Sequence, residues 1–502
     1  MEELKKLTGQ AANARRSACA KCSPRSLALL LCNYVLVIGT ILFLLTVYLV
    51  FTRTRPNNEP TGRTFQELTY IRSAYRVSDS TIRLVIVRSV ENRRNLTYEF
   101  GLKRGYIRLD CHNEKCPDEF SPPCVITGFV GIIDGLTKNN RDSYMAVFSE
   151  GNETPLFVDI TDARRKNAPP HELGVMVQPV YLHTDFSAFV QFFEFWLSEN
   201  ATKFYIYRES YTREVGELLD FYSKQKGVDV EFVDWTGLPE ELKGEEATDE
   251  LNPNRFWFRL EVIRFSVFMA IFDAIHRSRT EVKYLAQTDL DEMLYVGPKR
   301  SVIDFMRAMD VQEPEMAAVS FRSQRVQISN GSWINVKHPK ELSFSNLESV
   351  VLENKVFKRP LYSKMVYKPE RVYRAHIHRQ LPTEPILGTD RSYKHVNIAP
   401  EGGVVLHVRR LPDMYKWTNA TNSDIVKAKA QTMQKNAAQR FKDFKSSLTE
   451  WNNYGLKVNE KIEKCRQAMN KNRRNACHNL FDCDRLITNV RWIRPPNSWI
   501  VV

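Results

Sequence analysis

The chain has 502 residues, of which 43% are hydrophobic and 26% are charged. A chain of this length and composition buries a sizeable core, so the sequence excludes a short peptide or a low-complexity tail and predicts one large domain or two. Its formal net charge of +13 suggests nucleic acid as a partner, but a net charge identifies partners only once its distribution along the chain is known.

The first 52 residues predict a membrane anchor. An uncharged run of 27 residues, Ser26 to Thr52, would span about 40 Å as a helix, which is enough to cross a bilayer. A cleaved signal peptide has an apolar region of about 7–15 residues followed by small residues, and neither condition holds here. Six cations and two anions precede the run, so the positive-inside rule places residues 1–25 in the cytoplasm and the remainder of the chain in a lumen or outside the cell.

Two features after the predicted anchor, residues 26–52, agree with this orientation. Six of the nine cysteines follow it, and an oxidising compartment allows up to three disulfides. Local clusters at 111–124 and 465–483 favour pairing within each cluster, although all fifteen pairings stay open; a zinc site that uses His112 is an alternative, but the Cys spacing does not match a finger or ribbon. Five sequons for N-glycosylation also follow the anchor: Asn95, Asn152, Asn200, Asn330 and Asn419.

A polar stem and a β-rich segment come next. Residues 53–75 are rich in Pro and Asn, which is typical of a stem that holds a folded part off the bilayer. Short β-branched or aromatic runs at Ile82 to Val90, Val125 to Val130 and Tyr144 to Phe148 then indicate strands. Residues 76–168 are therefore predicted to form a small, mainly β subdomain.

From Gly174 onward, predicted strands alternate with predicted helices. Repeated βα units predict a parallel sheet with helices on both faces, and such sheets bind ligands at the carboxyl ends of their strands. Aromatic residues on the last of these helices are predicted to be core. The expected strands are Val175 to Tyr181, Lys203 to Tyr207 and Val228 to Trp235, and the expected helices are Asp185 to Ser198, Arg213 to Gln225 and Arg255 to His276.

The segment YLAQTDLDEMLY, residues 284–295, carries the candidate chemistry. A predicted strand runs into Asp289, Asp291 and Glu292, and alternation puts the two aspartates on the same side of the chain. Crowded carboxylates repel one another unless a cation or turn amides compensate, and oxygen ligands suit Mg²⁺ or Mn²⁺, which commonly bridge a nucleotide diphosphate. An isolated Asp-x-Asp is more often a solvated turn, so its place at the end of a buried strand is what favours a metal.

Other common enzyme signatures are missing from the sequence. It contains no P-loop, Ser nucleophile elbow, His-Glu-x-x-His or Gly-x-Gly-x-x-Gly motif. Common NTPase, hydrolase, metalloprotease and dinucleotide-binding interpretations therefore lack support.

In combination, these segments resemble glycosyltransferase family 92, the lumenal galactosyltransferases with a GT-A fold. The matching pieces lie in order between residues 175 and 410: VQPVYLHTDFSAFVQFFEFWLSENATKFYIY, YLAQTDLDEMLY, KMVYKPERV from Lys364, a histidine shortly after it, and VVLHVRR with His407 and Arg409. The resemblance implies a GT-A type, Rossmann-like α/β domain over residues 169–423 that binds a nucleotide sugar. It also implies UDP-galactose as donor, Mn²⁺ as cofactor, a glycan on a glycoprotein or glycolipid as acceptor, an inverting single displacement and residence in the Golgi as a single-pass type II membrane protein.

The same resemblance implies roles for the acids and for one histidine. Asp291 is expected to bind the metal, with Asp289 on the metal or the ribose. Glu292 orients the loop or binds substrate, with a salt bridge as the alternative. His407 is a candidate third metal ligand, and a satisfied buried histidine is the alternative.

Basic residues and a general base complete the expected site. Lys364, Arg371 and Arg409 are expected to neutralise the diphosphate, although a single surface cation often has no special role. His376 and His378 share a face if their segment is a strand, and either is a candidate for the family's histidine. The base that deprotonates the acceptor is not identified by the sequence, and its candidates are Glu313, Glu315, Asp390 and Glu401.

Two departures from the family pattern stand out. The segment FRSQRVQISNG from Phe321 lacks the expected Gly-rich spacing, and Val408 replaces an expected Tyr. Two further functions stay open: the same fold with a different UDP-sugar donor, because Asp-x-Asp contacts the diphosphate and not the sugar, and a non-catalytic, membrane-anchored glycan-binding protein.

The net charge lies mostly at the ends of the chain. Residues 1–25 carry +4, and residues 424–475, with thirteen cations and five anions, carry +8. The predicted catalytic region is thus close to neutral, which removes nucleic acid as a leading partner. Residues 424–502 are predicted to form a basic helical C-terminal region with a Cys cluster, and a solvated helical face is preferred there over a surface for an anionic glycan or lipid.

Overall fold

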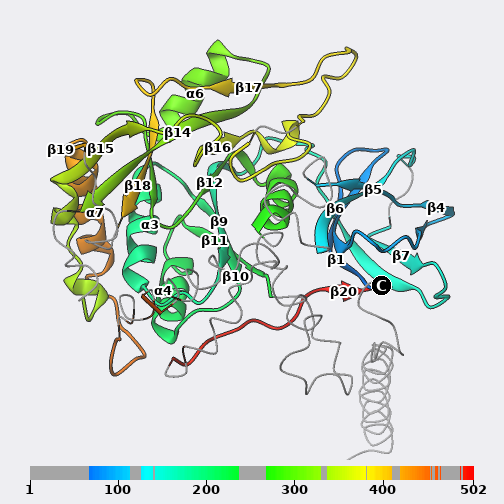
Figure 1. The fold of residues 1–502 in the computed structure, drawn as a ribbon, viewed down its shortest axis with the longest axis horizontal. Helices are drawn as coiled ribbons and strands as arrows, with labels where there is room; N and C mark the ends of the chain where they lie inside the picture. The colour runs from blue at the N-terminus through cyan, green and yellow to red at the C-terminus, as the bar shows by residue number, and fades with distance from the viewer. Residues whose placement is uncertain are drawn as a thin grey trace, which may run out of the picture. The chain divides into compact units, whose positions relative to one another are not determined.

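The structure is a computed structural model, and its described residues form two β-sheets with helices (Figure 1). Within the part of the chain that is described, no helix is both long and apolar enough to cross a membrane. The predicted anchor at 26–52, Asn330 and the second cysteine cluster lie outside that part. The described residues are 67–112, 126–138, 142–236, 267–328, 336–379, 382–409, 419–452 and 490–502, with a few single residues between 454 and 487.

A nine-stranded sheet contains the predicted β-rich segment. The strands expected from the sequence near Ile82, Val125 and Tyr144 are all present. Cys111, at the end of β5, takes part in a disulfide bond whose partner lies outside the described residues, so its pairing stays a prediction. The order of the strands is β4-β3-β7-β8-β1-β2-β6-β5, with β20 beside β1. Their bounds are β1 Thr69–Arg76, β2 Ile82–Ser89, β3 Leu96–Phe100, β4 Lys103–Tyr106, β5 Arg108–Cys111, β6 Ile126–Ile133, β7 Tyr144–Ser149, β8 Leu156–Asp162 and β20 Ile500–Val501.

The stem predicted for residues 53–75 is wrong at its C-terminal end. Residues 69–76 form β1, which lies between β8 and β2 and buries Tyr70, Ile71 and Tyr75. The polar residues before this strand obscured its pattern of large apolar side chains. The end of the chain returns to the same strand, because β20 pairs antiparallel with β1.

The second sheet has eleven strands and is mixed, with the path β11-β10-β9-β12-β16-β14-β15-β19. Strands β11, β10, β9 and β12 are parallel, as predicted. The remainder departs from the predicted parallel sheet, because β16 and β15 run antiparallel to β14. Strands β17 and β18 run parallel to β14, although no α-helix lies in the described part of the chain that connects β14 to them. The bounds are β9 His171–Val180, β10 Lys203–Arg208, β11 Asp229–Asp234, β12 Val282–Thr288, β13 Glu292–Tyr295, β14 Met316–Ile328, β15 Val350–Val356, β16 Lys364–Tyr367, β17 Lys394–Asn397, β18 Val404–Arg409 and β19 Ala420–Ser423.

Helices α3 (Phe186–Ser198), α4 (Arg213–Ser223), α6 (Val302–Gln312) and α7 (Lys427–Arg440) pack in one core with this sheet. The sequence predicted α3 and α4 nearly to the residue. Asp185 begins α3 by accepting a hydrogen bond from the backbone N–H of Ser187 at 3.0 Å. After α3 the chain turns through Asn200, whose φ of 65° is a left-handed conformation that Asn tolerates better than most residues.

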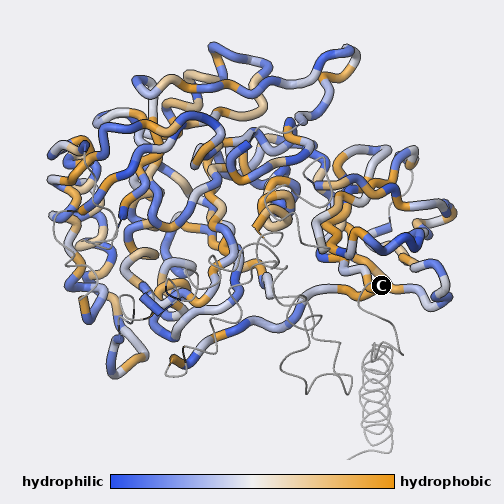
Figure 2. Tube along the Cα trace, viewed as in Figure 1, coloured by the Kyte–Doolittle hydropathy of each residue, from blue (hydrophilic) through white to orange (hydrophobic). Residues whose placement is uncertain are grey.

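The opposite face of the sheet packs against both a helix and the N-terminal sheet. Along β9, Val175 and Val177 join the core with α3 and α4, whereas Met176 points to the other side. There it shares a core with the helical residues 267–277 and with Tyr75 of β1. Figure 2 shows hydrophobic segments along these strands and on that helix. The two aromatic residues of the described helix, Phe268 and Phe272, are core, as predicted; residues 255–266 of the predicted helix lie outside the described part.

Asp273 links the two sheets through a buried cluster of hydrogen bonds. Its carboxylate accepts from Ser73 at 2.5 Å, Tyr75 at 2.6 Å, Tyr207 at 2.6 Å and Arg277 at 2.9 Å. Burial acts to raise the pKa of Asp273, but the charge of Arg277 and the hydrogen bonds outweigh it and hold the pKa at about 2. The group is therefore an ionised carboxylate inside the core.

Helix α7, in the predicted basic C-terminal region, packs against α3. Lys429 pairs with the buried Glu199 at 2.5 Å, and Arg440 pairs with the buried Glu194 at 2.9 Å. The predicted solvated face is confirmed for exposed cations such as Lys427, but the prediction is wrong for Lys429, which is buried. These pairs supply the opposite charge for two buried carboxylates, which also accept hydrogen bonds from the Tyr222 hydroxyl and the Val302 N–H.

Glu209 is predicted to make the free energy of unfolding depend on pH. It follows β10 and is buried; burial raises its pKa to about 8, against the opposing charge of Arg494. In the unfolded chain the pKa is about 4.3. The stabilisation from this group is therefore complete below that pKa and is lost as the pH rises through about 8.

We expect Glu209→Gln, which stays neutral at every pH, to raise the free energy of unfolding at pH 9 by on the order of a few kcal/mol, and by much less at pH 5. Unfolding by urea at the two pH values measures this difference. Glu153→Gln at an exposed site is the control and should be pH-independent. An equal effect of Glu209→Gln at both pH values would contradict the assignment.

Candidate functional site

The three acids of the predicted motif lie in a tight turn between β12 and β13. The backbone N–H of Glu292 donates to the carbonyl of Asp289 at 3.2 Å, and the N–H of Asp289 donates to the Glu292 carboxylate at 3.0 Å. Asp289 and Asp291 therefore lie in a turn and not along one strand, so the alternation that predicts them on the same side of the chain does not apply. Turn amides supply part of the compensation that the crowded carboxylates need.

Pairing of the strands brings basic side chains to this turn. Strand β16 lies beside β12 and begins with Lys364. Strand β18 runs antiparallel to β13, with His407 opposite Glu292. These pairings link segments that are far apart in the sequence, and they place the predicted cations next to the predicted acids.

Lys364 neutralises two of the three acids. Its Nζ lies 2.8 Å from an Asp289 oxygen and 3.2 Å from a Glu292 oxygen. Burial alone would lower the pKa of Lys364, but the charges of Asp289 and Glu292 outweigh burial and raise it. Because only 4% of the lysine side chain is exposed, it holds the acid turn in place instead of facing solvent.

Asp291 pairs with His407 on the other side of the turn. His407 Nε2 lies 3.0 Å from Asp291 Oδ2, and an Arg409 nitrogen lies 3.9 Å from the same oxygen. Burial acts to raise the pKa of Asp291, but His407, Arg409 and Lys364 hold it at about 2; the charge of Asp291 in turn raises the pKa of His407 against burial. With 32% of its side chain exposed, Asp291 presents a carboxylate to solvent.

Glu292 is an internal member of the cluster. Only 2% of its side chain is exposed, and its oxygens meet Lys364 and the N–H of Asp289. Burial and the charge of Asp289 raise its pKa. Of the roles considered from the sequence, this geometry supports orientation of the loop.

The donor types at the turn suit a divalent cation. Asp289, Asp291 and His407 offer carboxylate oxygens and an imidazole nitrogen, and the two aspartates are each about one-third exposed. In the described parts of the chain, however, no three His, Cys, Asp or Glu side chains are grouped so as to hold a metal ion. Asp289 is occupied by Lys364 and by Gln178, which donates to it.

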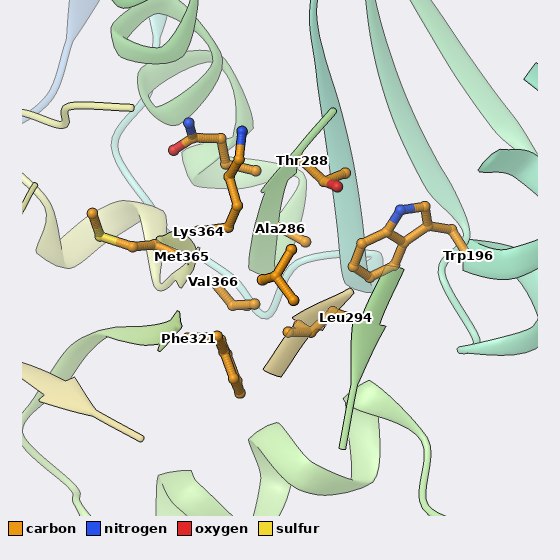
Figure 3. A pocket seen from close by; sticks show the side chains of 10 residues that line it. Trp196, Ala286, Thr288, Leu294, Phe321, Lys364, Met365 and Val366 are labelled. Carbon is orange, nitrogen blue, oxygen red and sulfur yellow. The ribbon is translucent and has the colours of Figure 1, made fainter. Parts of the chain in front are cut away.

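A small, mainly apolar cavity is lined by Thr288, which precedes the acid turn, and by Lys364, which pairs with it (Figure 3). The cavity, of about 10 Å³ and with room for about one water molecule, is also lined by residues that include Trp196, Leu294 and Phe321. Lys364 extends away from these side chains in Figure 3. Val408, the departure from the expected Tyr, is 1% exposed and belongs to the core on this side, so the substitution changes packing.

Several predicted site residues lie elsewhere. Arg371 donates to the backbone carbonyls of Pro314 and Met316 at 2.6 and 2.9 Å, and so braces the start of β14. The base candidate Glu315 pairs with Arg391 at 2.7 Å. The other base candidates, Glu313, Asp390 and Glu401, are exposed, and Glu401 precedes β18 at the end opposite His407.

His376 and His378 do not share a face, because their segment is not a strand. His376 is buried, with its ring 4.6 Å from that of Phe268. His378 lies nearer the acid turn: its Nδ1 is 3.0 Å from the carbonyl of Ser363, and burial together with the charge of Lys364 lowers its pKa to about 4. His378 is therefore the one that borders the site.

Gln178 is a site residue that the sequence did not reveal. Strands β9 and β12 are parallel, with Val177 paired to Thr288, so the next residue of each strand lies at the same edge. The Gln178 amide donates to Asp289 there. Gln178 is the second residue of the family-matching piece VQPVY, but that match assigned it no role; the register of the two strands is what identifies it.

Comparisons with known proteins identify the family of the chain. The sequence model of glycosyltransferase family 92 matches residues 171–465, more than half of the chain, and includes α7. No curated protein matches. Among solved structures, the chain is similar to "UTP-bound UGPase from acinetobacter baumannii" with 8% identity over 58% of this chain and 99% of that chain; the TM-score is 0.20, so this likeness carries no argument.

Proposed function

Because the chain belongs to glycosyltransferase family 92, we propose that it transfers galactose from UDP-galactose to an acceptor glycan, in a metal-dependent reaction that inverts the sugar carbon. The observation that supports this proposal most is the acid turn at the carboxyl end of the parallel strands. Open α/β sheets bind their ligands at that edge. A GT-A type fold is part of the same proposal, and the strand path β11-β10-β9-β12 is consistent with it.

Departure of UDP requires positive charge near the diphosphate. Arg409 is the best placed of the predicted cations, because it lies beside Asp291 and its side chain is 24% exposed. Lys364 acts indirectly by fixing Asp289 and Glu292, and Arg371 is bound elsewhere.

Asp291 and His407 would hold the divalent cation, with Asp289 beside them. When bound, the ion would supply Lewis-acid neutralisation of the leaving diphosphate. The contribution of the chain is to keep Asp291 ionised at any pH above about 2 and to orient it through His407 and Arg409. Because hydrogen bonds from neighbouring side chains orient metal ligands, Lys364 and Gln178 would do the same for Asp289.

A donor panel tests the proposal. The full chain is incubated with Mn²⁺, a series of UDP-sugars and para-nitrophenyl glycosides of common pyranoses as acceptors. We expect transfer from UDP-galactose, at least a hundredfold loss with EDTA, and recovery on addition of Mn²⁺. Transfer only from another UDP-sugar would show that the donor is not UDP-galactose, and transfer that resists EDTA would contradict metal dependence. Glycan binding without transfer would favour a non-catalytic protein.

We also propose a single-pass type II arrangement in the Golgi membrane, with residues after 52 in the lumen. The uncharged run at 26–52 and the basic tail before it support this orientation. Four of the five sequons fall on described residues, and three of them, Asn95, Asn200 and Asn419, are exposed while Asn152 is half-buried. Removal of glycans by peptide N-glycosidase F, read as a mobility shift, checks the lumenal placement.

A further inference from the structure

A surface tyrosine beside the acid turn has an unusual backbone conformation. Tyr362 has a φ of 56°, in the left-handed region that bulky residues rarely occupy. It follows a turn in which the N–H of Leu361 donates to the carbonyl of Lys358 at 3.0 Å. Strained conformations of this kind cluster at ligand sites, where the surrounding structure holds them.

The backbone places Tyr362 close to Lys364, which pairs with two residues of the acid turn. Two residues later comes the buried Lys364, so the Cα atoms of the two residues are no more than about 7.6 Å apart. The residue between them, Ser363, is buried and its carbonyl lies 3.0 Å from His378 Nδ1. The chain thus passes from the protein surface into the acid turn within three residues.

Aromatic and basic neighbours fix the tyrosine ring. It meets the Phe357 ring at 5.1 Å and the His378 ring at 6.0 Å, both edge to face. The Arg325 guanidinium lies 5.7 Å from the same ring, and Arg325 pairs in register with His407 across β14 and β18. Despite these contacts, 37% of Tyr362 is exposed, as is 57% of Leu361.

This combination has the chemistry of a sugar subsite. One face of a pyranose carries C–H groups that pack on an aromatic ring, and its hydroxyls need polar partners at the rim. Tyr362 supplies the ring and its own hydroxyl, while the Arg325 guanidinium lies over the ring and the His378 ring meets it edge to face. A fixed ring also loses little conformational freedom when it binds.

We propose that Tyr362 is the platform on which the acceptor sugar stacks, next to the acid turn. This inference rests on the proposed transferase function and adds the chemical class of the acceptor group, a pyranose presenting its apolar face. The donor diphosphate belongs at Asp291 and Arg409, so acceptor and donor contact different residues.

Two substitutions at Tyr362 distinguish the contribution of the ring from that of the backbone conformation. Tyr362→Gly removes the ring, and glycine accepts the left-handed conformation without strain, so the turn is retained. Tyr362→Phe keeps the ring and removes the hydroxyl. Tyr144→Ala is the matched control, because Tyr144 is also an exposed tyrosine, 53% accessible, with a Phe157 ring edge to face at 5.7 Å, on the N-terminal sheet.

The assay uses the full chain and the para-nitrophenyl glycoside that supports transfer. We expect Tyr362→Gly to raise the acceptor KM at least tenfold, with the donor KM and acceptor-independent UDP release within twofold of wild type, and Tyr362→Phe and Tyr144→Ala to stay within about threefold. An unchanged acceptor KM in Tyr362→Gly, or an equal rise in donor KM, would overturn the proposal. If the wild-type chain transfers no sugar, the proposed function itself has failed, and that result is visible before any variant is compared.

Discussion

Asp291→Asn is expected to reduce the rate of sugar transfer by about a thousandfold. The substitution keeps the shape of the side chain but removes a carboxylate whose pKa is held at about 2 and whose oxygen contacts His407 at 3.0 Å. Without this charge, His407 loses the partner that raises its pKa, and Arg409 loses its anchor. Initial rates at saturating donor and acceptor measure the loss.

A matched control separates chemistry from folding. Asp159→Asn changes an exposed aspartate of β8 and should leave the rate unchanged. Thermal unfolding of Asp291→Asn should remain close to that of wild type, because the side chain is partly exposed. If Asp291→Asn retained more than a tenth of the wild-type rate, Asp291 would not be a metal ligand.

The βα part of the fold could be predicted from the sequence because its signals are local. Helix α3 begins after Asp185 and ends at Ser198, where the apolar helical pattern of the sequence ends. Strand β10 begins at Lys203, as predicted. Apolar periodicity, caps and left-handed Asn residues act over a few residues, so a single sequence carries them.

Long-range pairing explains what the sequence did not predict. The directions of β15 and β16 depend on hydrogen bonds to β14, and the burial of β1 depends on β2, β8 and β20. Likewise, Lys429 reads as a solvated cation until α7 is placed against the buried Glu199. In each case the deciding partner is distant along the chain.

The residues of the candidate site also fall into those that the sequence predicted and those that depend on distant pairing. Asp289, Asp291, Lys364 and His407 were predicted from the acid motif and the family resemblance, and the structure brings them together. Arg371 follows Lys364 by only seven residues, yet it lies at the start of β14, where it donates to the Met316 carbonyl. Gln178, to which the resemblance assigned no role, enters the site through the register of β9 and β12.

Asp273→Ala is expected to lower the free energy of unfolding by about 3–5 kcal/mol, the cost of removing one partner from a buried charge pair. The change leaves Ser73, Tyr75 and Tyr207 without their acceptor and Arg277 without its i,i+4 partner. Since these donors come from both sheets and from the helix between them, the loss weakens the contact that joins the sheets. The shift of the urea midpoint measures it.

Two further variants show that burial and charge set this cost. Asp220→Ala breaks an i,i+4 pair with Lys224 on α4 that is exposed on both sides, and should cost less than about 0.5 kcal/mol. Replacing both Asp273 and Arg277, as Asp273→Ala with Arg277→Met, should recover part of the loss, because it also removes the charge of Arg277, which in Asp273→Ala keeps Glu231 as a partner but loses Asp273. If Asp273→Ala cost as little as Asp220→Ala, the buried carboxylate would not be what joins the two sheets.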